Sequence, residues 1–216
     1  WGSAAGGDRA FRAAARPRLQ CQHQQGPRIT YPPGARKARA PPAAPPHRPG
    51  PAATPEERLA MLQAAVAGTP ALEVDGRELA RPGPSYTVDT LASLRAEHPH
   101  EALCLCLGAD AFRALDTWHR WREIPALAHL AVARRPRGRL PARGPVAELL
   151  QQARVAGPEG LAGRLAGGVV LVDLPRLEVS ATRIRALLAA GRDPRWLLPD
   201  PVLEIIRERG LYLARN

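Results

Sequence analysis

The sequence predicts an α/β fold built on a doubly wound parallel sheet. Short apolar runs that suit buried strands alternate with longer segments whose apolar residues recur at helical spacing. Residues 102–107 form a continuous apolar run, which is typical of a strand buried on both faces of a parallel sheet. The chain has 216 residues, of which 45% are hydrophobic, so it is long enough to bury the core of one such domain.

The predicted elements begin with a helix at Thr54. The residues Thr54-Pro55-Glu56-Glu57 have the pattern of a capping box with proline in the first turn, and Gly68 follows as a helix stop. A strand and a turn come next, and strands and helices then alternate to the end of the chain. The expected strands are residues 71–75, 102–107, 129–133 and 169–174, and the expected helices are residues 87–97, 109–115, 121–127, 146–154, 182–190 and 201–209.

The first 52 residues differ in composition from the rest of the chain. They hold nine arginine or lysine side chains against one aspartate, which accounts for most of the net charge of +11. Proline pairs at 32–33 and 41–42 interrupt regular structure, and no apolar periodicity is present. We therefore expect a basic, low-complexity segment rich in Arg, Pro and Ala at residues 1–44, without ordered structure, and a folded domain at residues 45–216.

The composition narrows the classes of protein to consider. Outside the basic segment the charges nearly balance, so binding of nucleic acid by the domain is not expected. No run of eighteen apolar residues occurs, and we therefore expect no membrane span. Three cysteines are too few and too poorly spaced for a disulfide framework or a zinc site, and no metal held by protein side chains is expected. Cys104 and Cys106 alternate within the apolar run at residues 102–107, so they are expected to share one face of that strand. The reducing cytoplasm is the expected compartment.

A candidate phosphate site follows the last predicted strand. Ser180 and Thr182 stand at the start of a helix that carries Arg183 and Arg185. Unpaired backbone amides, hydroxyl groups and forked guanidinium groups together suit phosphate oxygens. The simpler interpretation is a serine N-cap followed by arginines exposed to solvent.

Two other segments combine hydroxyl groups with aromatic rings. Ser85, Tyr86 and Thr87 lead into the helix predicted at residues 87–97, where hydroxyls and aligned amides can receive a carboxylate or simply cap the helix. The run Trp118-His119-Arg120-Trp121 places two tryptophans together in a chain with only 4% aromatic residues. Such rings can stack on a flat heterocycle, and the simpler interpretation is a pair of core anchors.

Two charged residues follow predicted strands at their carboxyl ends, where ligands bind in open α/β sheets. Asp110 comes just after the strand at residues 102–107 and can accept a hydrogen bond from a ribose hydroxyl or cap the next helix. Arg134 comes just after the strand at residues 129–133, where its guanidinium can meet an anionic ligand.

These runs resemble the motifs of the bacterial nicotinate mononucleotide adenylyltransferases, which belong to the nucleotidyltransferase superfamily. Residues 179–185 are similar to the superfamily signature Ile-Ser-Ser-Thr-x-Ile-Arg, with Val179 in place of isoleucine and Ala181 in place of the second serine. Residues 85–91 fit the family pattern at all seven positions, and residues 118–121 resemble its Trp-His-x-Trp run. The resemblance extends over residues 45–212.

The resemblance implies a Rossmann-like sheet of the nucleotidyltransferase type and a specific reaction. ATP would transfer its adenylyl group to nicotinate mononucleotide, giving nicotinate adenine dinucleotide and pyrophosphate, with Mg²⁺ accompanying the triphosphate. ATP and nicotinate mononucleotide are thus the implied partners. The implied phosphate-binding residues are Ser180, Thr182 and Arg185, and the implied substrate-binding residues are His47, Arg48, Ser85, Tyr86, Thr87, Asp110, Trp118, His119 and Arg134.

The family's first signature, Gly-Gly-Thr-Phe-Asp-Pro followed by His-x-Gly-His, has no counterpart in residues 1–44. We therefore expect a sheet that is incomplete at its amino-terminal end and weak or no turnover by this chain. Our hypothesis is that residues 1–44 are a misread or truncated amino terminus, since 30 arginines against one lysine indicate a gene rich in G and C. The alternative is a natural unstructured extension, and a transit peptide is disfavoured because serine is nearly absent.

Two other functions stay open from the sequence. One is a different adenylyltransferase of the same superfamily, such as the phosphopantetheine branch, which residues 85–91 and 118–121 disfavour. The other is a non-catalytic nucleotide- or RNA-binding protein that uses the basic first 52 residues.

Overall fold

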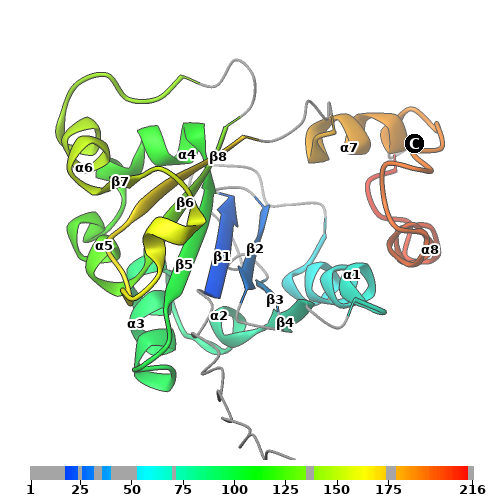
Figure 1. The fold of residues 1–216 in the computed structure, drawn as a ribbon. Helices are drawn as coiled ribbons and strands as arrows, with labels where there is room; N and C mark the ends of the chain where they lie inside the picture. The colour runs from blue at the N-terminus through cyan, green and yellow to red at the C-terminus, as the bar shows by residue number, and fades with distance from the viewer. Residues whose placement is uncertain are drawn as a thin grey trace, which may run out of the picture.

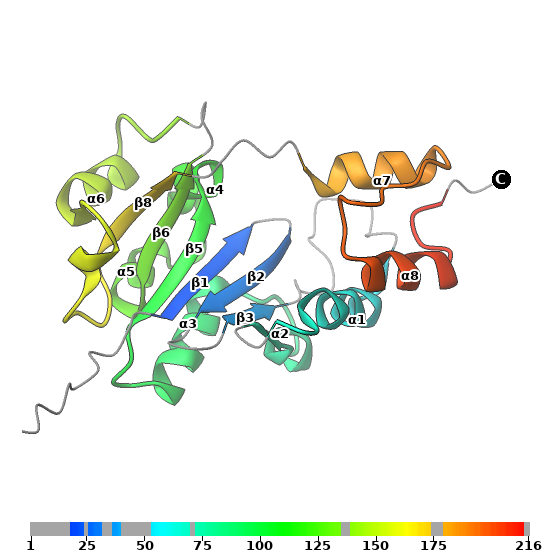
Figure 2. The same ribbon diagram turned by 45° about the vertical axis from the view of Figure 1, so that its right-hand side comes forward.

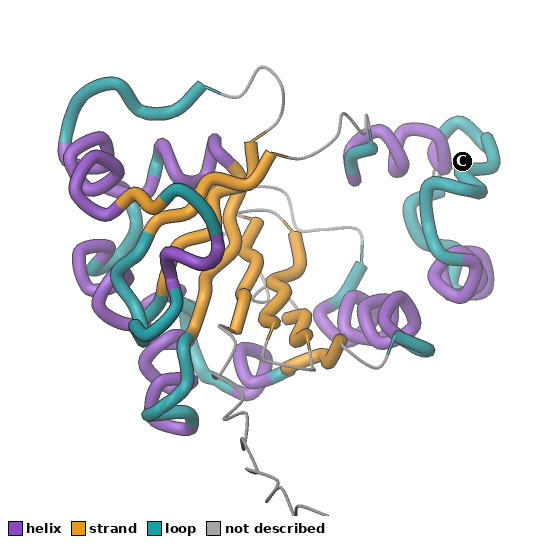
Figure 3. Tube along the Cα trace, in the orientation of Figure 1, coloured by secondary structure: helices purple, strands orange, loops and turns teal. Residues whose placement is uncertain are grey.

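A computed structural model gives the fold of residues 18–23, 26–31, 36–39, 53–69, 72–134, 139–173 and 179–213, with only the backbone described for the first three ranges. An eight-stranded sheet forms its centre, in the order β4-β3-β2-β1-β5-β6-β8-β7 (Figures 1 and 3). Its strands are β1 Arg18–His23, β2 Gly26–Tyr31, β3 Arg36–Arg39, β4 Leu72–Asp75, β5 Leu103–Gly108, β6 His129–Arg134, β7 Arg154–Val155 and β8 Val169–Asp173.

Most neighbouring strands of this sheet run parallel, as predicted. β1, β5, β6, β8 and β7 pair in parallel, and so do β3 and β4. β2 differs from the prediction because it runs antiparallel to both β1 and β3. The reason is local, since the short connections on either side of β2 allow hairpins but not crossovers. The other strand pairs agree with the predicted α/β class and its doubly wound parallel sheet.

Strands β1, β2 and β3 lie in the segment where no ordered structure is expected from the sequence. β1 runs beside β5 with Arg18 opposite Leu103 and Gln22 opposite Leu107. For residues 18–23, 26–31 and 36–39, these strands differ from the expectation of an unstructured segment. Ladder hydrogen bonds use backbone groups and can form where the side chains show no apolar periodicity. The division of the chain at residue 45 stays a prediction.

The helices largely follow their sequence signals. Thr54 accepts a hydrogen bond from the Glu57 amide at 3.2 Å, and the Thr54 amide donates to Glu57 Oε2 at 2.7 Å, so the predicted capping box is confirmed. The helix predicted at residues 121–127 is instead a 3₁₀ turn at residues 121–123 followed by a short α-helix at residues 124–127. Pro125 lies in the first turn of the α-helix, where proline is tolerated, whereas inside a continuous helix it would break the hydrogen bonding. The helices are α1 Pro55–Val66, α2 Arg77–Ala80, α3 Thr87–Glu97, α4 Ala109–Arg113, α5 Ile124–Leu127, α6 Pro145–Ala153, α7 Ala181–Ala189 and α8 Asp200–Glu208, with 3₁₀ turns η1 Leu115–Thr117, η2 Trp121–Glu123 and η3 Pro158–Leu161.

Strand β5 is the centre of the core and is buried on both faces. Leu103, Leu105 and Leu107 belong to the larger apolar cluster, which includes side chains of α3, α4 and α6. Cys104 and Cys106 belong to a smaller cluster on the opposite face. The predicted placement of the two cysteines on one strand face is therefore confirmed.

A third apolar cluster joins the carboxyl-terminal helices to α1. Ile184 and Leu188 of α7 pack with Leu203 and Ile206 of α8, and Met61 of α1 lies against them. In Figures 1 and 2 these three helices form a group on the β2–β3 side of the molecule, away from α5 and α6. Within the described part of the chain, no helix is both long and apolar enough to cross a membrane.

Candidate functional site

The segment Ser85-Tyr86-Thr87 leads into α3 without acting as an ordinary cap. Tyr86 is the N-cap residue, and it makes no capping hydrogen bond through its side chain. The Ser85 hydroxyl donates instead to the Glu78 carbonyl at 3.3 Å, and Thr87 is buried. Tyr86 remains 40% exposed. The simpler interpretation, in which Ser85 or Thr87 caps this helix, is therefore wrong.

The run from Trp118 to Trp121 forms a turn between η1 and η2. Both tryptophans are half-buried and pack against the main core cluster, so each has the anchoring role that the simpler interpretation assigned to it. The Trp118 Nε1 atom is buried and has no hydrogen-bond partner among the described residues. Arg120, between them, adopts a left-handed backbone conformation with φ of 49°. The turn thus exposes His119 while holding its tryptophans against the core.

The two predicted pyridine-binding segments meet in the structure. The rings of Tyr86 and His119 lie 4.2 Å apart between centroids, with their planes inclined at 31°. Next to this contact, Arg120 Nη1 lies 3.4 Å from Asp89 Oδ1 in the first turn of α3. Arg120 also binds the Glu123 carboxylate at 2.8 and 2.6 Å. The start of α3 and the 118–121 turn therefore form one surface, although no sequence periodicity links them.

The carboxyl ends of the parallel strands carry the predicted charged residues. Asp110 is exposed and pairs with Arg113 at 3.2 Å, and because Gly108 occupies the N-cap of α4, Asp110 is not the cap. Arg134 ends β6 and forms a two-pronged pair with Asp173, the last residue of β8, at 2.8 and 2.9 Å. This hydrogen-bonded pairing lowers the pKa of the Asp173 carboxyl.

Asp173 is a residue of this edge that sequence reasoning missed. No motif marks it, but the strand register places Arg134 directly opposite Asp173. A sequence signal was available, since each of the two residues is the polar residue that ends an apolar strand. The guanidinium predicted to meet an anionic ligand therefore already has a carboxylate partner.

The predicted phosphate-binding residues lie on α7. Ser180 is its N-cap and accepts a hydrogen bond from the Arg183 amide at 3.2 Å, as the simpler interpretation expected. Thr182 and Arg185 are exposed. In Figures 1 and 2, α7 lies with α8 and α1, well apart from α3 and α5. His47 and Arg48 lie outside the described residues.

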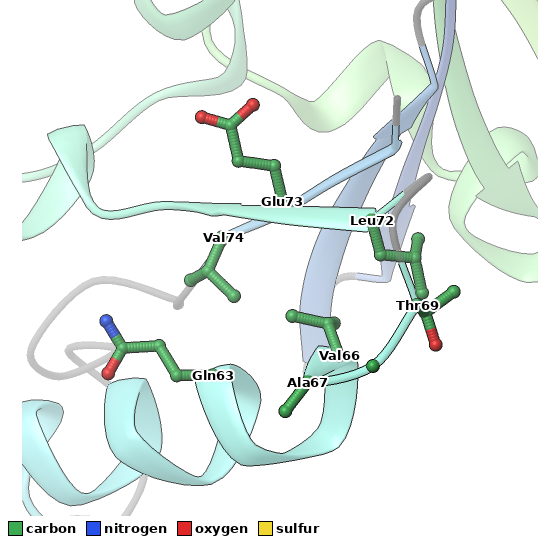
Figure 4. A pocket seen from close by; sticks show the side chains of 8 residues that line it. Gln63, Val66, Ala67, Thr69, Leu72, Glu73 and Val74 are labelled. Carbon is green, nitrogen blue, oxygen red and sulfur yellow. The ribbon is translucent and has the colours of Figure 1, made fainter. Parts of the chain in front are cut away.

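A hollow of about 450 Å³ lies elsewhere, between the carboxyl end of α1 and strand β4 (Figure 4). Val66, Leu72 and Val74 line it, and the Glu73 side chain points to the side of β4 opposite α1. None of the predicted site residues that the structure describes lines it. The hollow therefore adds no substrate-binding group to the surface formed by α3 and the 118–121 turn.

Comparison with known proteins identifies the family. The cytidylyltransferase-like family model matches residues 40–187. Proteins named "Probable nicotinate-nucleotide adenylyltransferase" from Marinobacter nauticus, Aeromonas salmonicida and Pseudomonas syringae pv. tomato are 47%, 46% and 48% identical to this chain. These matches cover 79%, 79% and 82% of this chain and 80%, 79% and 79% of the relatives.

Two solved structures share the fold. The Plasmodium falciparum nicotinic acid mononucleotide adenylyltransferase complexed with NaAD superposes with a TM-score of 0.58 at 13% identity, covering 79% of this chain and 78% of that chain. The same enzyme complexed with APC gives 0.54 at 14% identity, covering 73% and 75%. These likenesses confirm the predicted fold. With relatives at 46–48% identity, the chain belongs to the nicotinate-nucleotide adenylyltransferases of the cytidylyltransferase-like family.

Proposed function

We propose that this chain transfers the adenylyl group of ATP to nicotinate mononucleotide, forming nicotinate adenine dinucleotide in NAD biosynthesis. The observation that carries the proposal is the contact between Tyr86 and His119, at 4.2 Å. It joins the two segments that the family resemblance assigns to the pyridine ring. Relatives at 46–48% identity with the corresponding name support the same reaction.

The reaction needs alignment of two anions more than covalent help from the protein. An oxygen of the 5′-phosphate of nicotinate mononucleotide forms a bond to the α-phosphorus of ATP. The bond from that phosphorus to the oxygen bridging to the β-phosphate breaks, and pyrophosphate leaves with the electron pair. The protein lowers the barrier by positioning both substrates and by neutralising their repulsion.

The pyridine ring of nicotinate mononucleotide would lie at the joined surface. Ser85, Thr87 and the amides at the start of α3 would face the carboxylate, because a helix amino terminus favours an anion. Trp118 would stack on the ring.

The other predicted residues would serve the phosphates and the ribose. Ser180, Thr182 and Arg185 would hold the ATP phosphates, Asp110 would accept from a ribose hydroxyl, and Arg134 would meet an anionic group. Asp173 engages Nε and Nη2 of Arg134, which leaves Nη1 able to donate to a ligand. The resemblance gives His47 and Arg48 a supporting contact to the ligand.

We propose that Mg²⁺ enters with ATP, with phosphate oxygens as its principal ligands. Within the described residues, no group of three or more His, Cys, Asp and Glu side chains lies close enough to hold a metal ion. We propose the reducing cytoplasm as the compartment, because three cysteines are too few and too poorly spaced for a disulfide framework.

The test is release of pyrophosphate from ATP and Mg²⁺ in the presence of nicotinate mononucleotide. A matched protein should carry the amino-terminal segment of the Marinobacter nauticus relative in place of residues 1–44. We expect release that depends on nicotinate mononucleotide, weak for this chain and strong for the chimera. Release with phosphopantetheine instead would favour the other branch of the superfamily. Absence of release by both proteins, with salt-dependent RNA binding lost on removal of residues 1–52, would favour the RNA-binding alternative.

A further inference from the structure

Glu78 is a buried carboxylate beside the pyridine-binding segment. It belongs to the four-residue helix α2 and is only 2% exposed. Its Oε1 accepts a hydrogen bond of 2.7 Å from the Thr90 hydroxyl, and Thr90 is itself fully buried. Burying a carboxylate is costly unless hydrogen bonds compensate for the lost water. The Thr90 hydroxyl therefore supplies one of the interactions that hold this carboxylate in place.

The contacts of Glu78 reach both ends of the segment from residue 85 to residue 90. Its backbone carbonyl accepts from the Ser85 hydroxyl at 3.3 Å, and its carboxylate accepts from Thr90. Within the segment, the Thr90 amide donates to the Tyr86 carbonyl at 3.2 Å. Arg81 Nη1 also reaches Thr90 Oγ1, at 3.4 Å. These hydrogen bonds tie α2, the following turn and the first turn of α3 into one network.

We infer that Glu78 is a positioning residue that fixes the start of α3 for nicotinate mononucleotide, an inference that rests on the proposed function. Glu78 is buried and would act on residues 85–90 through its hydrogen bonds with Ser85 and Thr90, without touching the substrate. Loss of the Glu78–Thr90 hydrogen bond would let the backbone amides at the start of α3 and the Tyr86 side chain shift. A displacement of about 1 Å can cost on the order of 100-fold in rate when it moves a binding group.

The effect of the network should be selective between the two substrates. The residues of this network lie at and around positions 85–87, which are assigned to the pyridine. The residues assigned to the ATP phosphates lie on α7 instead. Weakening the network should therefore change the affinity for nicotinate mononucleotide and leave the affinity for ATP close to its original value. A purely structural role would instead lower stability and affect both substrates alike.

The experiment compares Thr90→Val with Thr90→Ser. Valine matches threonine in shape but has no hydroxyl to donate to Glu78, whereas serine keeps the donor. The Kd and KM for nicotinate mononucleotide and for ATP are measured on the full chain, together with the thermal midpoint. We expect Thr90→Val to weaken nicotinate mononucleotide on the order of tenfold, with ATP nearly unchanged, and Thr90→Ser to recover most of that loss.

A double-mutant cycle assigns the effect to Glu78. Glu78→Ala should weaken nicotinate mononucleotide in the same way, and the double variant Glu78→Ala, Thr90→Val should be little worse than either single variant. Equal affinities in Thr90→Val and Thr90→Ser, or parallel losses for both substrates, would overturn the inference. If neither the unaltered chain nor the chimera binds or uses nicotinate mononucleotide, the proposed function itself fails, and this outcome is visible before any variant is compared.

Discussion

Tyr86 and His119 stack with their ring centroids 4.2 Å apart, and this contact joins two segments that are distant in the sequence. One segment opens α3, and the other forms the turn between η1 and η2. The Asp89–Arg120 ion pair reinforces the junction at 3.4 Å, but it is exposed and such pairs contribute little. The ring contact therefore links the two segments at the exposed side of this surface, and the packing of Trp118 and Trp121 on the core cluster links them beneath it.

Substitution of either ring should weaken nicotinate mononucleotide binding. Aromatic pairs contribute about 0.5–1.5 kcal/mol beyond their buried area, so we expect Tyr86→Ala or His119→Ala to raise the Kd by roughly two- to twelvefold. Tyr86→Phe keeps the ring and should stay close to the unaltered chain. Isothermal titration checks this, and fully additive losses in the double variant would show that the rings do not cooperate.

Trp118→Phe tests the buried indole donor. Phenylalanine keeps an aromatic ring against the core but removes the Nε1–H, which has no partner among the described residues. We expect the free protein to lose little stability beyond the change in ring size, because the donor that is removed has no partner in the described part of the chain. The affinity for nicotinate mononucleotide should stay close to its original value, because the ring that is proposed to stack on the pyridine is kept. Denaturant unfolding and titration with the ligand measure the two effects separately, and a large rise in the Kd would contradict a role of the ring alone.

The buried His129 should make stability depend on pH. The Gly168 amide donates to Nδ1 at 2.9 Å, so Nε2 carries the proton and donates to the Arg164 carbonyl at 3.0 Å. Burial lowers the pKa of this imidazole below its ordinary value. Between the folded pKa and an unfolded value of about 6.5, the unfolded chain binds more protons.

The contribution of His129 to stability should therefore be complete above about pH 6.5 and decline as the pH falls towards the folded pKa. Denaturant unfolding at a series of pH values measures this decline. His129→Gln serves as the control because its side chain does not titrate, and the difference between the two curves removes the effect of the other histidines. Parallel curves would contradict the assigned tautomer and burial.

Trp196 should contribute almost nothing to stability. It is 89% exposed and has a left-handed backbone with φ of 69°. Glycine tolerates that conformation, so Trp196→Gly should change the free energy of unfolding by less than about 0.5 kcal/mol. Leu203→Ala, at a position 1% exposed in the same part of the fold, should cost about 2–5 kcal/mol. Equal losses in the two variants would show that the indole packs after all.

Local sequence signals predicted the features that depend on neighbouring residues. The capping box at Thr54 and the bounds of α3 needed only such signals, and the alternation of leucine and cysteine along β5 identified its two faces. Features set by pairing between distant segments were not predicted. The Arg134–Asp173 pair depends on the register of two strands, and the burial of Glu78 depends on how α2 meets α3. Neither leaves a periodic pattern in the sequence.

The central claim is tested most directly by following the α-phosphate of ATP. This chain and the chimera with the Marinobacter nauticus amino-terminal segment are incubated with ATP labelled at the α-phosphorus, Mg²⁺ and nicotinate mononucleotide. We predict that the label appears in nicotinate adenine dinucleotide, with pyrophosphate released in equal amount. Label that remains in ATP, or that appears in AMP without a dinucleotide, in both proteins would contradict the assignment.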